Sequence, residues 1–190
     1  MNPLYVSSSL SCHGFCYFQT PIKRQKDYFY PVKGNDSKYL PSIKNLFENS
    51  VESLYKDQAS TLEKIARGED RNSELLIRGK YPEGLVIYKT EPSDEYSNYG
   101  VKESLEIKTL VVCDPNANSS SYLKTALLKR VDQYANNKKI LNQHVIVSEK
   151  APADQDFFQK KGFECVAEWQ NQHLLGCKEK LFSKKNVTIL

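Results

Sequence analysis

Several side chains in this sequence are of types that bind metals or act as nucleophiles. Cys12, His13 and Cys16 lie close together near the start of the chain. A tetrahedral zinc site usually draws its ligands from two such groups, and no second group follows at a zinc-like spacing. The sequence therefore predicts no metal site.

One further cysteine and two histidines stand in or beside predicted strands. Cys113 has no histidine near it in the sequence to activate its thiol, so we expect a buried structural cysteine. His144 opens a predicted strand, and His173 lies in the hairpin that closes the chain. Histidines in such places are more often surface or hydrogen-bonded groups than acid–base catalysts, and we predict neither as catalytic.

The spacing of apolar residues predicts the elements that hold these side chains. Helical periodicity predicts four helices, at 41–55, about 59–66, 120–136 and 154–161. Short apolar runs predict seven strands, at 28–32, 74–78, 84–89, 105–113, 144–148, 164–169 and 173–177. Strand and helix alternate after a hairpin, which predicts an α/β (α+β) fold with a mixed sheet covered by helices on both faces.

The strand at 105–113 should lie at the centre of this sheet. Strict alternation predicts one face from Leu105, Ile107, Thr109 and Val111, and the other from Glu106, Lys108, Leu110 and Val112. Its far end is apolar on both faces, which is typical of a central strand buried by helices.

Length and charge exclude several classes of protein. A chain of 190 residues fits one domain, and no uninterrupted apolar run reaches the roughly 18–20 residues of a membrane span. The net charge of +4 suits an anionic ligand, but no concentrated basic face marks a nucleic-acid partner. An odd number of cysteines without a signal peptide predicts free thiols and a cytoplasmic protein.

The order of these elements, together with the stretches LEIKTLVV (105–112), LKTALLKR (123–130) and DFFQKKGFECV (156–166), resembles the GNAT superfamily of acyl-CoA-dependent N-acetyltransferases. The resemblance implies a mixed, mostly antiparallel sheet flanked by helices. It places a GNAT-like domain at 27–182 and a C-terminal tail at 183–190. Residues 1–26 precede it as an extension that forms an extra strand, a partner-binding arm or nothing ordered.

The resemblance also implies how acetyl-CoA, or another acyl-CoA, would bind. The strand at 105–112 would part from the strand at 145–148, so that the main chain of Leu110, Val111 and Val112 holds the pantetheine arm. The following loop and helix start would hold the phosphates, through Asn118, Ser119, Ser120, Ser121, Tyr122, Leu123 and Lys124. Phe157 or Phe158 would lie beside the acyl-CoA.

The sequence departs from the family at this loop and at the expected acid. In the family the phosphate loop is rich in glycine, whereas this sequence has Ser119, Tyr122 and Lys124 at the corresponding positions. The alternative is that the serines only cap a helix. Many members have a tyrosine at the position of Phe158 that protonates the leaving thiolate, and phenylalanine has no such proton. Ala151 replaces an asparagine that is common in the family.

The resemblance assigns a general base and an acceptor region. Glu106 matches the strand glutamate that deprotonates the amine directly or through water; the alternative is a solvated carboxylate paired with Lys108. Tyr96 and Tyr99 lie on an acidic insertion where the family often shapes its acceptor pocket, and exposed loop tyrosines without a role are the alternative.

The predicted function is acetyl-CoA-dependent N-acetyl transfer to a primary amine of a small molecule or a protein. The main alternative is a GNAT-like domain that has lost turnover and serves as a binding or regulatory module. A toxin that acetylates aminoacyl-tRNA is a third reading, for which the sequence carries no motif of its own.

Overall fold

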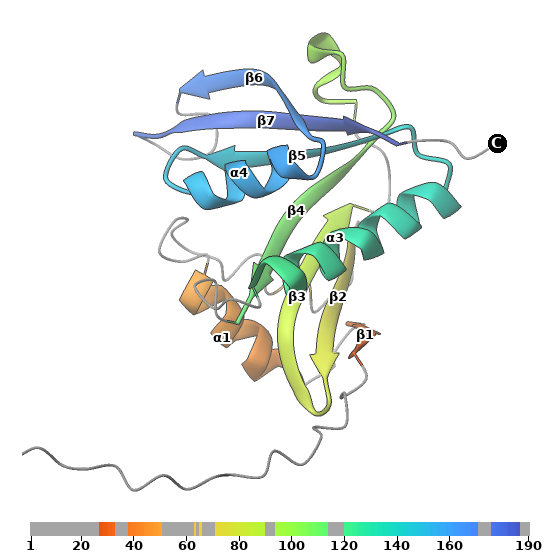
Figure 1. Cartoon of the computed structure of the whole chain (residues 1–190), viewed down its shortest axis with the longest axis vertical. Coiled ribbons are helices and arrows are strands. Elements are labelled where there is room, and N and C mark those ends of the chain that lie inside the picture. The colour runs from red at the N-terminus through yellow and green to blue at the C-terminus, as the bar shows by residue number, and fades with distance from the viewer. Residues whose placement is uncertain are drawn as a thin grey trace, which may run out of the picture.

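The computed structural model (Figure 1) describes residues 27–32, 38–50, 63, 65, 71–89, 94–113, 120–170 and 176–186, with no side chains for 48–50. The strands are β1 (Asp27–Pro31), β2 (Arg71–Arg78), β3 (Tyr81–Lys89), β4 (Ser104–Val112), β5 (Asn142–Ser148), β6 (Glu164–Gln170) and β7 (Lys178–Lys185). The helices are α1 (Leu40–Ser50), α3 (Ser120–Asn137) and α4 (Pro152–Lys160), with a 3-10 turn, η1 (Ser97–Tyr99).

The strands form one sheet in the order β1-β2-β3-β4-β5-β7-β6. Every neighbouring pair is antiparallel except β4 and β5, which are parallel and therefore need the crossover that α3 supplies. The predicted fold class, a mixed and mostly antiparallel sheet, is confirmed.

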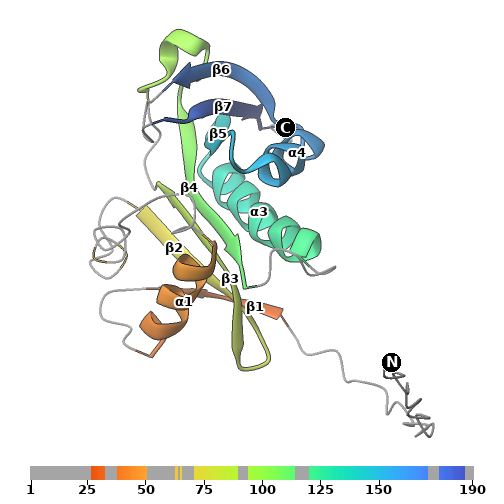
Figure 2. The ribbon, with the colours of Figure 1, turned by 90° about the vertical axis from the view of Figure 1, so that its left-hand side faces the viewer.

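Helices cover both faces of the sheet, as predicted, because successive strand residues point to opposite sides. One layer joins α1 to β2, β3 and β4 through Ile43, Leu46, Phe47, Leu75, Ile77, Leu85, Ile87 and Val111. The layer on the opposite face joins α3 and α4 to the strands through Leu123, Leu127, Leu128, Val131, Phe157, Phe158, Leu76, Val86, Tyr88, Leu105 and Ile107. Figure 2 shows α1 on one side of β2–β4 and α3 on the other.

The segment that follows β3 covers the other half of the α1 face. Tyr96 and Val101 are buried there against Leu181 of β7, with Trp169 packed beside them. The strand β4 thus lies between a half-sheet covered by α1 and a half-sheet covered by residues 94–103.

A bulge in β4 overturns the strict alternation that the sequence suggested. Tyr88 pairs with Ile107, but the next residue back along β3, Ile87, pairs with Thr109, so Lys108 is an extra residue. Beyond the bulge the faces exchange: Val111 packs with the α1 layer, whereas Ile107 packs with the α3 layer. Sequence periodicity cannot reveal an inserted residue of this kind, because a bulge changes pairing rather than composition.

A buried polar group ties α3 to the sheet beside this bulge. Glu74 of β2 is 4% exposed, and its carboxylate accepts hydrogen bonds from Tyr88 Oη at 2.5 Å and from Arg130 Nε at 2.6 Å. A buried carboxylate is tolerated when such donors replace water. The contact fixes where α3 crosses β2 and β3.

The last strand differs from its prediction. Gly176 and Cys177 precede the strand, which occupies Lys178–Lys185 instead of 173–177 and extends the sheet three residues past Phe182. Its sequence, KEKLFSKK, has only Leu181 and Phe182 as apolar residues, so it does not display a strand pattern. Lysine stems can cover apolar surface while the charge reaches water, which explains how such a segment pairs inside a sheet.

The other elements lie where the apolar pattern placed them, within a few residues at each end. Of the helix predicted at 59–66, only Glu63 and Ile65 are described, and both are helical. The extension at 1–26 lies outside the described residues. Among the described helices, none combines the length and apolar character that a membrane span requires.

Replacing Gly84 by valine should separate α3 from the sheet. A Cβ atom at Gly84 would lie 3.0 Å from Leu127 Cδ1 and 3.1 Å from the carbonyl oxygen of Val111. We expect the unfolding free energy to fall by about 1–3 kcal/mol, measured by urea denaturation. The same change should cost less in a Leu127→Ala background, which removes the Cδ1 atom, whereas fully additive effects would contradict this packing.

Candidate active site where two strands part

The parallel ladder between β4 and β5 ends in the middle of both strands. Pairing runs from Ser104–Asn142 to Ile107–Val145 and then stops. Beyond that point Thr109, Leu110 and Val111 pair with β3 alone, while Ile146, Val147 and Ser148 pair with β7 alone. Among the described strands, the predicted parting of these two is therefore present.

Exposure changes at the same place. Leu105, inside the paired region, is 0% exposed, whereas Thr109 and Leu110 are only half-buried although they lie in the central strand of a seven-stranded sheet. On the side away from β3, these residues have no strand partner among the described strands, so their main chain retains hydrogen-bonding groups that an added strand or ligand can use.

The carboxylate of Glu106 lies at the base of this opening. Glu106 pairs in register with His144 on the rung before the ladder ends. Its side chain is 5% exposed; Lys108 Nζ lies 2.6 Å from Oε1 and Lys89 Nζ lies 3.2 Å from Oε2. The predicted ion pair with Lys108 exists, but the carboxylate is buried and not solvated.

The charges around Glu106 decide its protonation state. Burial acts to raise the pKa of Glu106, but the charge and hydrogen bond of Lys108, together with His144 and Lys89, lower that pKa below its usual value. The group is therefore a carboxylate at neutral pH. A carboxylate with a lowered pKa is a weak proton acceptor and a good hydrogen-bond acceptor.

His144 is wholly buried beside Glu106. Its Nδ1 lies 2.9 Å from Ser104 Oγ, and its Nε2 has no hydrogen-bond partner among the described residues. Burial lowers the pKa of His144 to about 4, although Glu106 opposes this shift. The ring is therefore neutral at physiological pH.

Three aromatic rings cover this rung from the side of residues 94–103. The ring of Tyr96 lies edge-on to that of His144, with 5.1 Å between centroids, and contacts Trp169 at 5.6 Å. Trp169 Nε1 donates to Tyr99 Oη at 2.9 Å. Burial, followed by the charges of Glu95 and Glu106, raises the pKa of Tyr96, so its hydroxyl keeps its proton. Tyr96 thus lies beside His144 and near Glu106, whereas the exposed Tyr99 is linked to Tyr96 through Trp169.

The start of α3 lies on the opposite face. Of the predicted phosphate ligands, Ser120 and Ser121 are the first two helical residues, and Asn118 and Ser119 lie outside the described residues. Tyr122 Oη donates to Asp27 Oδ2 at 3.2 Å and its ring lies below Arg78, so this side chain points toward β1 and β2. Only the main chain of Tyr122 is left to serve as the predicted ligand.

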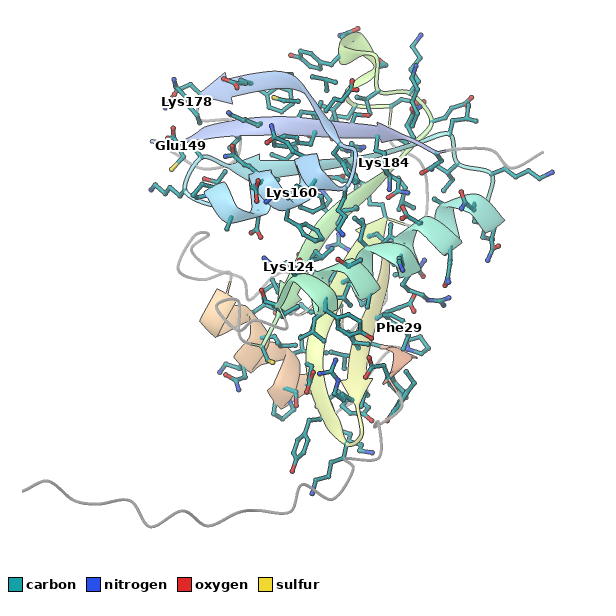
Figure 3. The ribbon with its side chains drawn as sticks, in the orientation of Figure 1. Phe29, Lys124, Glu149, Lys160, Lys178 and Lys184 are labelled. Carbon is teal, nitrogen blue, oxygen red and sulfur yellow. The ribbon has the colours of Figure 1, made fainter. Side chains whose placement is uncertain are left out.

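The remaining predicted cofactor residues pack in the core or pair with α4. Leu123, Val112 and Phe158 belong to the layer between α3, α4 and the sheet; Phe158 is 4% exposed and contacts Phe157 and Phe163. Lys124 Nζ donates to Asp154 Oδ1 at 2.5 Å and so joins the first turns of α3 and α4. Figure 3 labels Lys124 on the side of α3 that faces α4.

His144 was not predicted as a site residue from the sequence, and Ser104, Lys89 and Asp154 were not considered. Ser104 follows Glu103 and His144 follows Gln143, so each stands at the polar start of a strand, which periodicity treats as a strand end. Lys89 and Asp154 come near the site only through tertiary packing, which a single sequence does not display.

Comparison with known proteins gives matches in structure and not in sequence. No family model matches the chain, and no curated protein matches it. An acetyltransferase of the GNAT family from Desulfovibrio desulfuricans superposes with a TM-score of 0.67 at 12% identity, over 85% of this chain and 100% of its own.

Two further neighbours carry more specific descriptions. Arabidopsis thaliana NAA60 in complex with acetyl-CoA superposes with a TM-score of 0.66 at 15% identity, over 84% of this chain and 98% of its own. The ribosomal-protein-S18-alanine N-acetyltransferase from Escherichia coli gives 0.63 at 11% identity, over 85% of this chain and 94% of its own. Likeness at such low identity establishes the fold, and the fold that the resemblance implied is confirmed.

Burial of His144 makes stability depend on pH. The unfolded chain takes up a proton at this residue below the ordinary pKa of 6.5, and the folded protein does so only near pH 4. The folded-state pKa is the lower one, so the contribution is complete above pH 6.5 and is lost as pH falls to about 4. At about 1.4 kcal/mol per pH unit, the loss is about 3 kcal/mol.

Urea unfolding at several pH values, on the parent protein and on His144→Gln, measures this term. The variant should lose less unfolding free energy between pH 6.5 and pH 4, by about that amount. Parallel losses in the two proteins would mean that His144 titrates normally in the folded state.

Proposed function

We propose that this chain, which has the fold of GNAT acetyltransferases, moves an acetyl group from acetyl-CoA, or an acyl group from another acyl-CoA, to a primary amine. One observation carries the proposal: the β4–β5 ladder ends after Ile107, beside a buried carboxylate and a neutral imidazole. The resemblance places the pantetheine arm along the part of β4 that follows.

The described residues fit part of an acyl-CoA. The main chain of Thr109 and Leu110, which pairs with β3 and with no other described strand, matches an extended ligand with amide groups, which would bind as an added strand does. The main-chain N–H groups of Ser120 and Ser121, at the start of α3, suit a phosphate. Lys124 would supply a cation to the same phosphates once it leaves Asp154.

The bound thioester would supply an electrophilic carbonyl carbon. The nitrogen of the acceptor amine attacks that carbon, a C–N bond forms, the C–S bond breaks, and the sulfur leaves as a thiolate. Glu106, as a charged carboxylate, accepts a hydrogen bond from the amine or from a water molecule and so holds the nitrogen in place. Orientation of this kind accounts for much of the rate in a reaction between two bound partners.

The alternative is a domain of this fold that binds without turnover. Two observations favour it: Phe158 has no proton to give to the leaving sulfur, and Asp154 occupies the cation that a diphosphate would need. A free thiol has a pKa of about 8.5, so a thiolate can leave without a dedicated acid, and the loss at Phe158 slows transfer without forbidding it.

Calorimetry with acetyl-CoA, followed by an assay of thiol release with a panel of amines, tests the proposal. We expect binding and amine-dependent release of free coenzyme A. Binding without release would favour the alternative, and no binding at millimolar concentration would end the acetyl-transfer proposal. Glu106→Gln should lower kcat while it leaves the affinity for acetyl-CoA unchanged, because Leu105 and Ile107 face α3 and Glu106 between them faces the other side of the sheet.

The Lys124–Asp154 ion pair predicts a change in cofactor affinity. The side chains of Lys124 and Asp154 are 11% and 34% exposed, and a bound diphosphate must compete with the carboxylate for the ammonium group. Asp154→Asn should therefore tighten acetyl-CoA binding about three- to tenfold at low salt, with a smaller effect at high salt.

Asp156→Asn is the matched control for this change. It removes the same charge from the same helix, but among the described residues Asp156 pairs with Lys160 alone, and both side chains of that pair are mostly exposed. Its effect on acetyl-CoA affinity should be small. If the two variants change the Kd alike, the effect is one of net charge and the Lys124–Asp154 pair plays no part in binding.

A further inference from the structure

An amine of the chain itself lies at the carboxylate that the proposed function uses to hold the acceptor. Lys108 Nζ lies 2.6 Å from Glu106 Oε1, which is a charge-assisted hydrogen bond. The side chain of Glu106 is 5% exposed, whereas that of Lys108 is 35% exposed and so remains open to a reagent. An acceptor amine that used Oε1 would have to take the place of this ammonium group.

The bulge in β4 puts Lys108 at the point where the strands part. Ile107 forms the last rung with β5, and Lys108, the extra residue of the bulge, comes next. Its main chain begins the stretch of β4 that pairs with no described strand on the β5 side. Its side chain returns to Glu106, on the face of the sheet opposite α3.

The direction of the cofactor in the proposed function brings its thioester to the same residue. The phosphates would lie at the start of α3, which follows β4 in the chain. The pantetheine arm would then run back along β4, past Leu110 and toward Ile107, on the side away from β3. Its thioester end would therefore lie near Lys108.

A second amine, that of Lys89, lies on the other side of the carboxylate. Its Nζ is 3.2 Å from Glu106 Oε2, and its side chain is 25% exposed. Lys89 ends β3, the strand on the side of β4 that the cofactor would not occupy. Of these two lysines, Lys108 is therefore the one placed at the thioester.

We propose that Lys108 is a site of self-acylation, at which the chain takes an acyl group from its own bound acyl-CoA. The ammonium group first gives one proton to solvent. The neutral nitrogen attacks the carbonyl carbon of the thioester, a C–N bond forms, the C–S bond breaks, and a second proton passes from the nitrogen to the departing sulfur. The products are an N-acyl-lysine and free coenzyme A. The inference rests on the acyl-CoA binding of the proposed function and adds a modification site to it.

Acylation happens once per chain and changes the site. The amide that forms carries no charge, so the ion pair at Oε1 is lost and Lys89 is left to balance Glu106. Burial acts to raise the pKa of Glu106, and the charge and hydrogen bond of Lys108 oppose it, so acylation raises that pKa. The modified chain receives an acceptor amine at Glu106 without a competing ammonium group.

Peptide mapping by mass spectrometry, after incubation of the full chain with acetyl-CoA and no amine, tests the proposal. Lys160 is the internal reference, because its side chain is 72% exposed and lies on α4. Acetylation from free solution favours the more exposed lysine. We expect the acetylated fraction at Lys108 to exceed that at Lys160 about tenfold, because a bound thioester has a high effective concentration. A fraction at Lys160 or Lys89 that equals or exceeds that at Lys108 would contradict the proposal.

Acetyl phosphate is the control for the donor. It carries a reactive acetyl group but lacks the pantetheine arm that would lie along β4. We expect it to acetylate Lys160 at least as much as Lys108. If acetyl phosphate favours Lys108 as strongly as acetyl-CoA does, local reactivity and not a bound thioester selects the residue, and the proposal is wrong.

Two matched variants test the same point by thiol release in the absence of amine. Lys108→Arg keeps a positive charge beside Glu106 but cannot be acetylated, so the release of free coenzyme A should fall to the background of exposed lysines. Lys160→Arg makes the same change at the exposed reference and should retain the release of the parent protein. Equal release by the two variants would exclude Lys108 as the acceptor.

The outcomes separate this inference from the function on which it rests. If the parent protein transfers acetyl groups to amines while Lys108 stays unmodified, self-acylation is wrong and the proposed function stands. If the parent protein does not bind acetyl-CoA, the proposed function falls and the inference falls with it. Should Lys108→Arg fail to fold, the mapping of the parent protein still decides whether Lys108 is the acceptor.

Discussion

Parallel pairing between β4 and β5 stops after Ile107. The chemistry proposed for this protein depends on this early end of the β4–β5 ladder. A strand in the middle of a sheet normally gives its hydrogen bonds to two neighbours, yet Thr109 and Leu110 give theirs to β3 alone among the described strands. The bulge at Lys108 increases the local twist of β4 and directs it away from β5. A ligand can reach the main chain at the centre of the sheet only because of this departure.

Two of the buried carboxylates of the sheet, Glu74 and Glu106, are held in different ways, and the difference suits different roles. Glu74 accepts hydrogen bonds from Tyr88 and Arg130 and has the environment of a cross-link between α3 and the sheet. Glu106 is balanced by two lysines that remain partly exposed, beside a histidine whose Nε2 has no protein partner among the described residues. A fully satisfied group stabilises a fold, whereas a group that is balanced in charge but open to one more hydrogen bond suits a reaction.

The sequence was sufficient for the fold wherever apolar residues repeat. The strands around Leu85 and Leu105 and the helix around Leu127 were predicted because burial imposes a period on composition. β7 was misplaced, since lysines flank its two apolar residues, and the bulge at Lys108 was missed because pairing leaves no trace in composition. The candidate site was predicted only in part. Glu106 was identified through the resemblance, but His144 and Asp154 come near the site only when the chain is folded.

The residues that decide between an enzyme and a binding module are those at the start of α3, and not those around Glu106. Glycine in a phosphate loop lets main-chain N–H groups approach an anion, whereas Lys124 offers a side-chain charge that Asp154 already holds. That exchange would weaken the proposed cofactor binding without touching Glu106 or His144, because both side chains lie on the face of the sheet opposite α3. The buried Nε2 of His144 has no hydrogen-bond partner among the described residues, and this lowers stability unless a substrate or water completes it. That unmet hydrogen bond beside a buried carboxylate is the physical argument that favours the proposed catalysis over a binding module.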